Sequence, residues 1–189
     1  MRQKRIAIFA SGSGTNAQNI IEYFADNKDV VVDSLWANKP DAYALVRARN
    51  LGIETFIFNR EQFYNNSQIN SMLTERKVDL IVLAGFLWLI PYYLIRSFTI
   101  INIHPALLPK YGGKGMYGMN IHKSVVQNGD AESGITIHYV NEKYDEGTII
   151  FQAKCPVLAG DTPEQVATKV HELEYKHFPE VIESILEKL

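Results

Sequence analysis

The feature that most constrains the fold is an alternation of short β-branched runs with longer amphipathic stretches in the first half of the chain. The short runs are RIAIFA, VVVDSLWAN, IETFIFN, VDLIVLAG and FTIINIH, and helical periodicity follows each of the first four. A repeated strand–helix order implies parallel strands joined by crossover helices. The sequence therefore predicts an α/β fold with a Rossmann-like, mostly parallel sheet.

The pattern changes in the second half of the chain. SGITIHYV and GTIIFQAKCPVL flank the loop NEKYDEG, which predicts a late pair of antiparallel strands. A C-terminal helix is predicted with Thr162 as its N-cap, Pro163 at its first position and Gln165 completing a capping box. Pro179 predicts a kink or break in this helix. We find no repeat or linker in the 189 residues and expect one domain over residues 1–189.

Composition limits the partners. The net charge is -2 and basic residues do not cluster, so no nucleic-acid surface is predicted. The first apolar run, residues 6–10, is too short for a signal peptide or a membrane span. The single cysteine, Cys155, excludes an internal disulfide and is expected to be a buried apolar residue. We expect a cytoplasmic protein without a membrane partner.

The glycine-rich segment SGSGTN, residues 11–16, separates the first strand from the first helix. Gly14 permits a tight turn, Thr15 and Asn16 carry hydrogen-bonding side chains, and the free N–H groups of a helix start stabilise phosphate. A dinucleotide site would need an acidic residue at the end of the second strand, where WAN stands. A single phosphate is therefore favoured over NAD, with a plain strand-to-helix turn as the alternative.

The motif NIHP ends the fifth strand. Pro105 keeps His104 extended, and residues two apart on a strand project to one side, so Asn102 and His104 are expected to face the ligand edge of the sheet. An amide can donate to an oxyanion, and a histidine can move protons. If Asp145 of the NEKYDEG loop reached His104, it would raise the histidine pKa. A purely structural Asn–His pair is the alternative, and no metal-ligand spacing surrounds it.

Together, SGSGTN, LAGF, NIHPALLPKY and YDEG resemble the folate-dependent formyltransferases, in family order and over nearly the whole chain. The length favours the members that act on glycinamide ribonucleotide, because relatives acting on tRNA or hydrolysing the folate carry a further domain. The resemblance implies formyl transfer from 10-formyltetrahydrofolate, a co-substrate, to the amine of glycinamide ribonucleotide in de novo purine biosynthesis. It implies no metal and no NAD, and a monomer or homodimer.

The resemblance also implies roles for individual residues. The catalytic positions are Asn102, His104 and Asp145, and the substrate phosphate positions are Gly14, Thr15 and Asn16. The other positions near the ribonucleotide are Gly85, Pro105, His171, Glu172, Leu173 and Glu174. The folate positions are Arg60, Leu87, Trp88, Leu89, Ile90, Asn102, Asn141, Glu142, Lys143, Tyr144 and Asp145. The amine itself is expected to attack, with Asn102 and protonated His104 stabilising the oxyanion.

The sequence departs from the family pattern in two places. After LLPKY many members of the family continue with proline, glycine and one or two histidines, whereas this chain has GGKGMYGMNIH, so only His122 is matched there and contacts of residues 112–120 are not carried over. Trp88 stands where an arginine is familiar, which leaves its side-chain role open. Two alternatives remain, a hydrolase that releases formate from the same folate and a non-catalytic module that binds a nucleotide phosphate.

Overall fold

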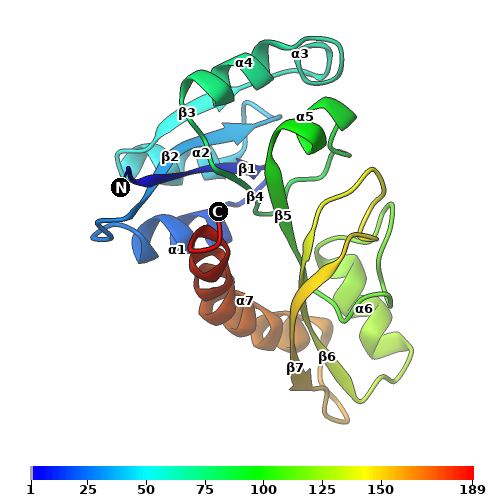
Figure 1. Ribbon diagram of the computed structural model, residues 1–189. Helices are drawn as coiled ribbons and strands as arrows, with labels where there is room; N and C mark the ends of the chain where they lie inside the picture. Colours follow the sequence, from blue (N-terminus) through cyan, green and yellow to red (C-terminus); the bar gives the residue numbers. More distant parts are fainter. Residues whose placement is uncertain (1) are drawn as a thin grey trace.

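Seven strands form one sheet in the computed structural model, which describes residues 2–189 (Figure 1). The strand order is β3-β2-β1-β4-β5-β6-β7. The strands are β1 (Lys4–Ala10), β2 (Val30–Ala37), β3 (Glu54–Ile57), β4 (Leu80–Leu83), β5 (Thr99–His104), β6 (Glu132–Tyr139) and β7 (Ile149–Pro156). The first five are parallel, β6 runs antiparallel to β5, and β7 runs antiparallel to β6. The predicted α/β fold with a late antiparallel pair is confirmed.

Helices cover both faces of this sheet (Figure 1). One face packs against α1 (Thr15–Tyr23), α2 (Tyr43–Asn50), α6 (Met119–Gln127) and α7 (Pro163–Leu186). The other packs against α3 (Arg60–Tyr64), α4 (Gln68–Glu75) and α5 (Tyr92–Ser97). Strand β1 serves both cores, since Ile6 and Ile8 point into the first and Ala7 and Phe9 into the second. A strand buried on both faces explains why RIAIFA reads as a nearly continuous apolar run.

Two of the stretches with helical periodicity, those after the third and fourth runs, are only partly helical. Residues 60–77 form α3 and α4 instead of one helix, because Asn66 uses its side-chain oxygen to accept from the Gln68 amide in a local turn. Residues 86–97 are helical only from Tyr92, since the preceding Pro91 has an extended backbone.

The C-terminal helix begins with the predicted capping box of Thr162 and Gln165 and continues through Pro179. Of the kink or break predicted there, the break is wrong. A proline leaves the carbonyl four residues earlier without its helical donor. That carbonyl belongs to Tyr175, and the side-chain amide of Asn19 donates to it at 2.9 Å. Helix α1 thus replaces the missing hydrogen bond.

Between residues 2 and 189, no helix is both long enough and apolar enough to span a bilayer. Cys155 is buried, and burial raises the pKa of its thiol, as expected for an apolar packing role. The carboxyl ends of β1, β4 and β5 meet at one edge of the sheet, where their following turns lie together.

Candidate active site

A cavity of about 630 Å³ opens at this edge of the sheet. Its walls come from the glycine turn after β1, the turn after β4, the end of β5, the loop before α6, the β6–β7 loop and α7. Among the predicted residues, the following line it: Gly14, Thr15, Asn16, Gly85, Leu87, Asn102, His104, Pro105, Tyr144, Asp145, His171 and Glu174. The structure therefore brings the predicted catalytic residues and the predicted phosphate residues into one space.

Asn102 and His104 lie on β5, and their partners across β6 are His138 and Thr136. The side-chain amide of Asn102 lies 3.1 Å from Nε2 of His138. Nδ1 of His138 lies 2.9 Å from the Tyr139 carbonyl, so Nδ1 carries the proton and Nε2 accepts from Asn102. One amide hydrogen of Asn102 is thereby committed to His138, and the second is free to donate to a ligand.

The tautomer of His104 is fixed in the same way. Its Nε2 lies 2.8 Å from the main-chain oxygen of Tyr111, which can only accept, so Nε2 carries the proton. Its Nδ1 lies 3.5 Å from Oδ1 of Asp145. Nδ1 is consequently the nitrogen left to exchange a proton in the cavity.

The side chain of His104 is buried, with 4% of the residue exposed. Burial lowers its pKa below the ordinary 6.5, while Asp145 and the Tyr111 carbonyl raise it and His138 lowers it. Asp145 acts in the direction predicted from the sequence, but desolvation outweighs it. The imidazole is therefore mostly neutral at pH 7, whereas the sequence led us to expect a protonated His104.

Asp145 connects two loops. Its Oδ2 accepts from the Gly113 amide at 2.8 Å, and its Oδ1 faces both His104 and His138. Burial alone would raise the pKa of this carboxyl, but His138 and His104 in their protonated forms, and the Gly113 amide, lower it. Asp145 is therefore an anion that fixes the start of the glycine-rich loop against the histidines.

The glycine turn has the features of an anion site. Gly14 is the N-cap of α1 with φ +77°, no side chain caps the helix, and its first turn holds no acidic residue. The initial N–H groups of α1 thus face the cavity without a competing carboxylate. A Cβ on Gly14 would lie 2.5 Å from the Cα of Ala44, so only glycine fits.

Glu174 of α7 lies beside this turn. It is 4% exposed, and its Oε2 accepts from the Asn16 amide at 3.0 Å. Burial raises its pKa to about 7, with the Asn16 hydrogen bond acting against the rise. Nε2 of His171 lies 3.8 Å from the same oxygen. A carboxyl group with a pKa of about 7 is protonated in about half of the molecules at pH 7, and its protonated form both donates and accepts hydrogen bonds. Such a group can bind ligand hydroxyl groups better than a second anion.

Two histidines of this site were missed or undervalued from the sequence. His138 carried no predicted role, although it orients Asn102. His122 of α6 was matched to the family without a role, yet it lines the cavity, is 2% exposed and has a buried Nδ1 without a partner among the described residues. Burial lowers the pKa of His122 to about 4. His138 and Thr136 lie two residues apart on β6, so both side chains project to one side of the sheet. Only the register of β6 against β5 shows that His138 lies opposite Asn102.

Other predicted folate residues lie outside the cavity. Arg60 lies over the rings of Tyr64 and Trp88, with distances of 5.4 and 5.6 Å to their centres, and lines a separate shallow cavity of about 380 Å³. The carbonyl of Leu89 accepts from the Tyr64 hydroxyl, and Ile90 is buried in the core. Trp88 thus belongs to an aromatic cluster in which it contacts both Arg60 and Phe86, and Phe86 lines the cavity.

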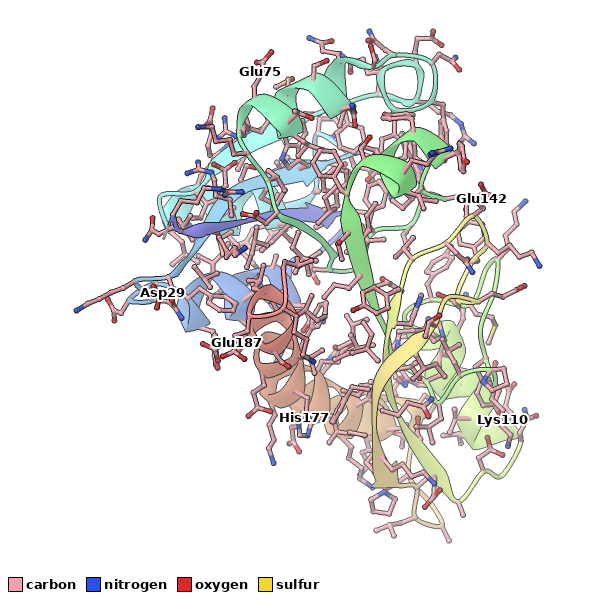
Figure 2. All side chains as sticks on the ribbon, viewed as in Figure 1. Asp29, Glu75, Lys110, Glu142, His177 and Glu187 are labelled. Atoms are coloured by element: carbon pink, nitrogen blue, oxygen red, sulfur yellow. The ribbon has the colours of Figure 1, made fainter. Side chains whose placement is uncertain are left out.

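The remaining predicted residues flank the site. Asn141, Glu142 and Lys143 belong to the β6–β7 loop but do not line the cavity, and Glu142 projects from the loop tip (Figure 2). On α7, Glu172 is exposed and Leu173 packs on the core, so neither lines the cavity.

No group of three or more histidine, cysteine or carboxylate side chains in residues 2–189 is arranged to hold a metal ion. The carbonyl of Gly85 accepts from the Ser11 amide at 3.1 Å and retains one lone pair for a ligand.

Comparisons with known proteins point in one direction. The sequence model of the formyl transferase family matches residues 4–182. The chloroplastic phosphoribosylglycinamide formyltransferase of Arabidopsis thaliana is 42% identical, over 99% of this chain and 67% of its own length. Phosphoribosylglycinamide formyltransferase of Haemophilus influenzae is 40% identical, over 95% of this chain and 85% of its own.

A solved structure agrees with these sequence matches. The crystal structure of glycinamide ribonucleotide transformylase 1 from Symbiobacterium toebii superimposes with a TM-score of 0.88 at 32% identity. The match covers 98% of this chain and 89% of that protein.

Proposed function

This chain belongs to the formyl transferase family, and from that premise we propose that it transfers the formyl group of 10-formyltetrahydrofolate to the amine of glycinamide ribonucleotide. One observation carries the proposal. The glycine turn at α1 shares its cavity with Asn102, His104 and Asp145. A ribonucleotide whose phosphate occupies the turn can extend its amine toward the histidine.

Attack begins with the substrate amine. Its lone pair forms a bond to the formyl carbon, and the carbonyl electron pair moves onto oxygen. The free amide hydrogen of Asn102 donates to this oxyanion, since its other hydrogen is held by His138. A donor of this kind contributes about 2.7 to 4 kcal/mol to transition-state stabilisation.

Proton transfer follows through His104. Neutral Nδ1 takes a proton from the attached ammonium group, and Asp145 and the Tyr111 carbonyl stabilise the resulting imidazolium. The oxyanion then re-forms its double bond, the bond to the folate nitrogen breaks, and Nδ1 returns the proton to that nitrogen. Nothing is oxidised or reduced, so the reaction as proposed needs neither a metal nor a nicotinamide.

The two substrates are proposed to enter from different sides. Asn16, His171 and Glu174 offer hydrogen bonds to ribose hydroxyls next to the phosphate turn. Leu87 and Tyr144 also line the cavity and offer apolar and aromatic surface to the flat folate ring, and Arg60, which lies over the Trp88 ring, is the proposed partner for the glutamate tail. Of the predicted folate segment, Ile90 is buried in the second core, Trp88 packs against that core, and the Leu89 carbonyl accepts from the Tyr64 hydroxyl.

The proposal is tested by incubating the protein with 10-formyltetrahydrofolate and following deformylation in three reactions. These contain glycinamide ribonucleotide, formyl-accepting methionyl-tRNA, or no acceptor. We expect turnover only with the ribonucleotide, and loss of that turnover in His104→Ala. Equal turnover without an acceptor would show a hydrolase, and binding of both ligands without turnover would show a non-catalytic module.

A further inference from the structure

The main-chain carbonyl that fixes His104 belongs to a residue with an unusual backbone. Tyr111 has φ +57°, which is uncommon for a residue other than glycine. Such a conformation costs about 1 to 3 kcal/mol and persists only where surrounding contacts hold it. Those contacts therefore also determine where the Tyr111 carbonyl points, and this carbonyl is the acceptor for Nε2 of His104.

The Tyr111 hydroxyl makes two of these contacts, in addition to the packing of its ring on the core. It donates to Oδ2 of Asp130 at 2.7 Å and accepts from the side-chain amide of Asn128 at 2.8 Å. Lys110 donates to the other oxygen of Asp130 at 3.1 Å. Asn128 caps the end of α6, and Lys110 lies at the outer surface (Figure 2). The hydroxyl is thus held on both sides by residues fixed to a helix end.

This anchor lies outside the catalytic cavity. Lys110, Tyr111 and Asp130 line a separate cavity of about 460 Å³, and none of them lines the cavity that holds Asn102 and His104. Removing the hydroxyl therefore leaves the lining of the catalytic cavity unchanged. It weakens the hold on the Tyr111 carbonyl, which accepts the hydrogen bond from Nε2 of His104.

We propose that Tyr111 is a positioning residue, whose hydroxyl, held by Asp130 and Asn128, fixes the carbonyl that keeps the His104 proton on Nε2 and Nδ1 free for proton transfer. The proposal rests on His104 moving the proton in the function proposed above. The charged and titratable groups facing His104 are Asp145 from the β6–β7 loop and His138 from β6. Because the Tyr111 carbonyl raises the His104 pKa, loosening it lowers that pKa.

The test replaces Tyr111 by phenylalanine, which keeps the ring and removes the hydroxyl. We expect kcat to fall about tenfold with both KM values within about twofold, and the acid limb of the kcat profile to move to lower pH. Tyr23→Phe is the matched control, since the Tyr23 hydroxyl donates to Glu183 at 2.9 Å and neither residue lines either cavity. It should keep wild-type kcat.

A second variant and a spectroscopic measurement complete the test. Asp130→Ala should reproduce most of the loss, and the double variant with Tyr111→Phe should lose no more than Tyr111→Phe alone, because both substitutions remove the hydrogen bond between the Tyr111 hydroxyl and Asp130. In ¹⁵N-histidine spectra, His104 should show the Nε2–H tautomer in the wild type and a mixture in both variants, whether or not formyl transfer is observed. Wild-type kcat together with an unchanged tautomer in either variant would overturn the proposal.

Discussion

Nδ1 of His104 lies 3.5 Å from Oδ1 of Asp145, which places an anion against the nitrogen that is free to exchange a proton. Asp145 raises the His104 pKa, although burial keeps it below 6.5. Asp145→Asn removes this effect and lowers the His104 pKa further. If neutral His104 accepts the amine proton, activity falls as pH drops through that pKa, so the acid limb of the variant should lie at lower pH.

We also expect kcat of Asp145→Asn to fall about 10²-fold at pH 7.5, because the imidazolium formed during proton transfer loses its counter-ion. The KM for the ribonucleotide should change little. Steady-state rates from pH 5 to 9 measure both effects. An acid limb at unchanged or higher pH would show that Asp145 does not act through His104.

His138 provides a second prediction. Its Nε2 accepts from the Asn102 amide at 3.1 Å and fixes which side of Asn102 donates. His138→Phe keeps a buried ring but removes the acceptor, so we expect kcat to fall about tenfold with a smaller change in KM. Combining it with Asn102→Ala should add little to the loss from Asn102→Ala alone. Fully additive losses would assign His138 a role independent of Asn102.

The sequence was sufficient to predict that Asn102 and His104 face the cavity, because that placement follows from two local rules. These are the two-residue period of a strand and the conformational restriction of a residue before proline. Only the family resemblance predicted that Asp145 belongs to the site, because sequence spacing does not show where the loop between β6 and β7 folds. His138 needed the register of β6 against β5, which pairs it with Asn102. The protonation state of His104 could be predicted only once the burial of its side chain was known, because burial lowers the His104 pKa by more than Asp145 raises it.

Helix boundaries show the same division. The capping box at Thr162 is a local signal and was predicted correctly. The continuation of α7 past Pro179 depends on Asn19 of a different helix, which donates to the Tyr175 carbonyl. A tertiary contact therefore overrides the local preference of proline.

Glu174 should make the free energy of unfolding depend on pH. Its pKa rises from 4.5 to about 7 in the folded state. Between these pH values the unfolded chain has released its proton while the folded protein keeps it, so the free energy of unfolding decreases as pH rises. At about 1.4 kcal/mol per pH unit, the loss reaches roughly 3 kcal/mol above pH 7.

Glu174→Gln cannot ionise and can keep the hydrogen bond from Asn16, so it should be more stable than wild type at pH 8, with a smaller gain at pH 5. Its KM for the ribonucleotide should rise, because the hydrogen-bonding pattern toward the ribose changes. Urea unfolding at the two pH values measures the first effect. Glu187→Gln, at the exposed end of α7 (Figure 2), is the control and should show neither change. Equal gains at both pH values would contradict a titrating Glu174.

The glycine turn can be tested with a matched pair of substitutions. Gly14 has φ +77°, and an added Cβ would lie 2.5 Å from Ala44, whereas a Cβ on Gly12 has no neighbour within 4 Å. Gly14→Ala should therefore destabilise the protein by more than about 2 kcal/mol, and Gly12→Ala by about 0.5 kcal/mol or less. Because the first N–H groups of α1 shift with the turn, Gly14→Ala should also raise the KM for the ribonucleotide more than the KM for the folate. Thermal unfolding and steady-state kinetics of both variants measure this, and equal destabilisation by the two substitutions would show that the close packing of the turn against α2 is not what requires glycine.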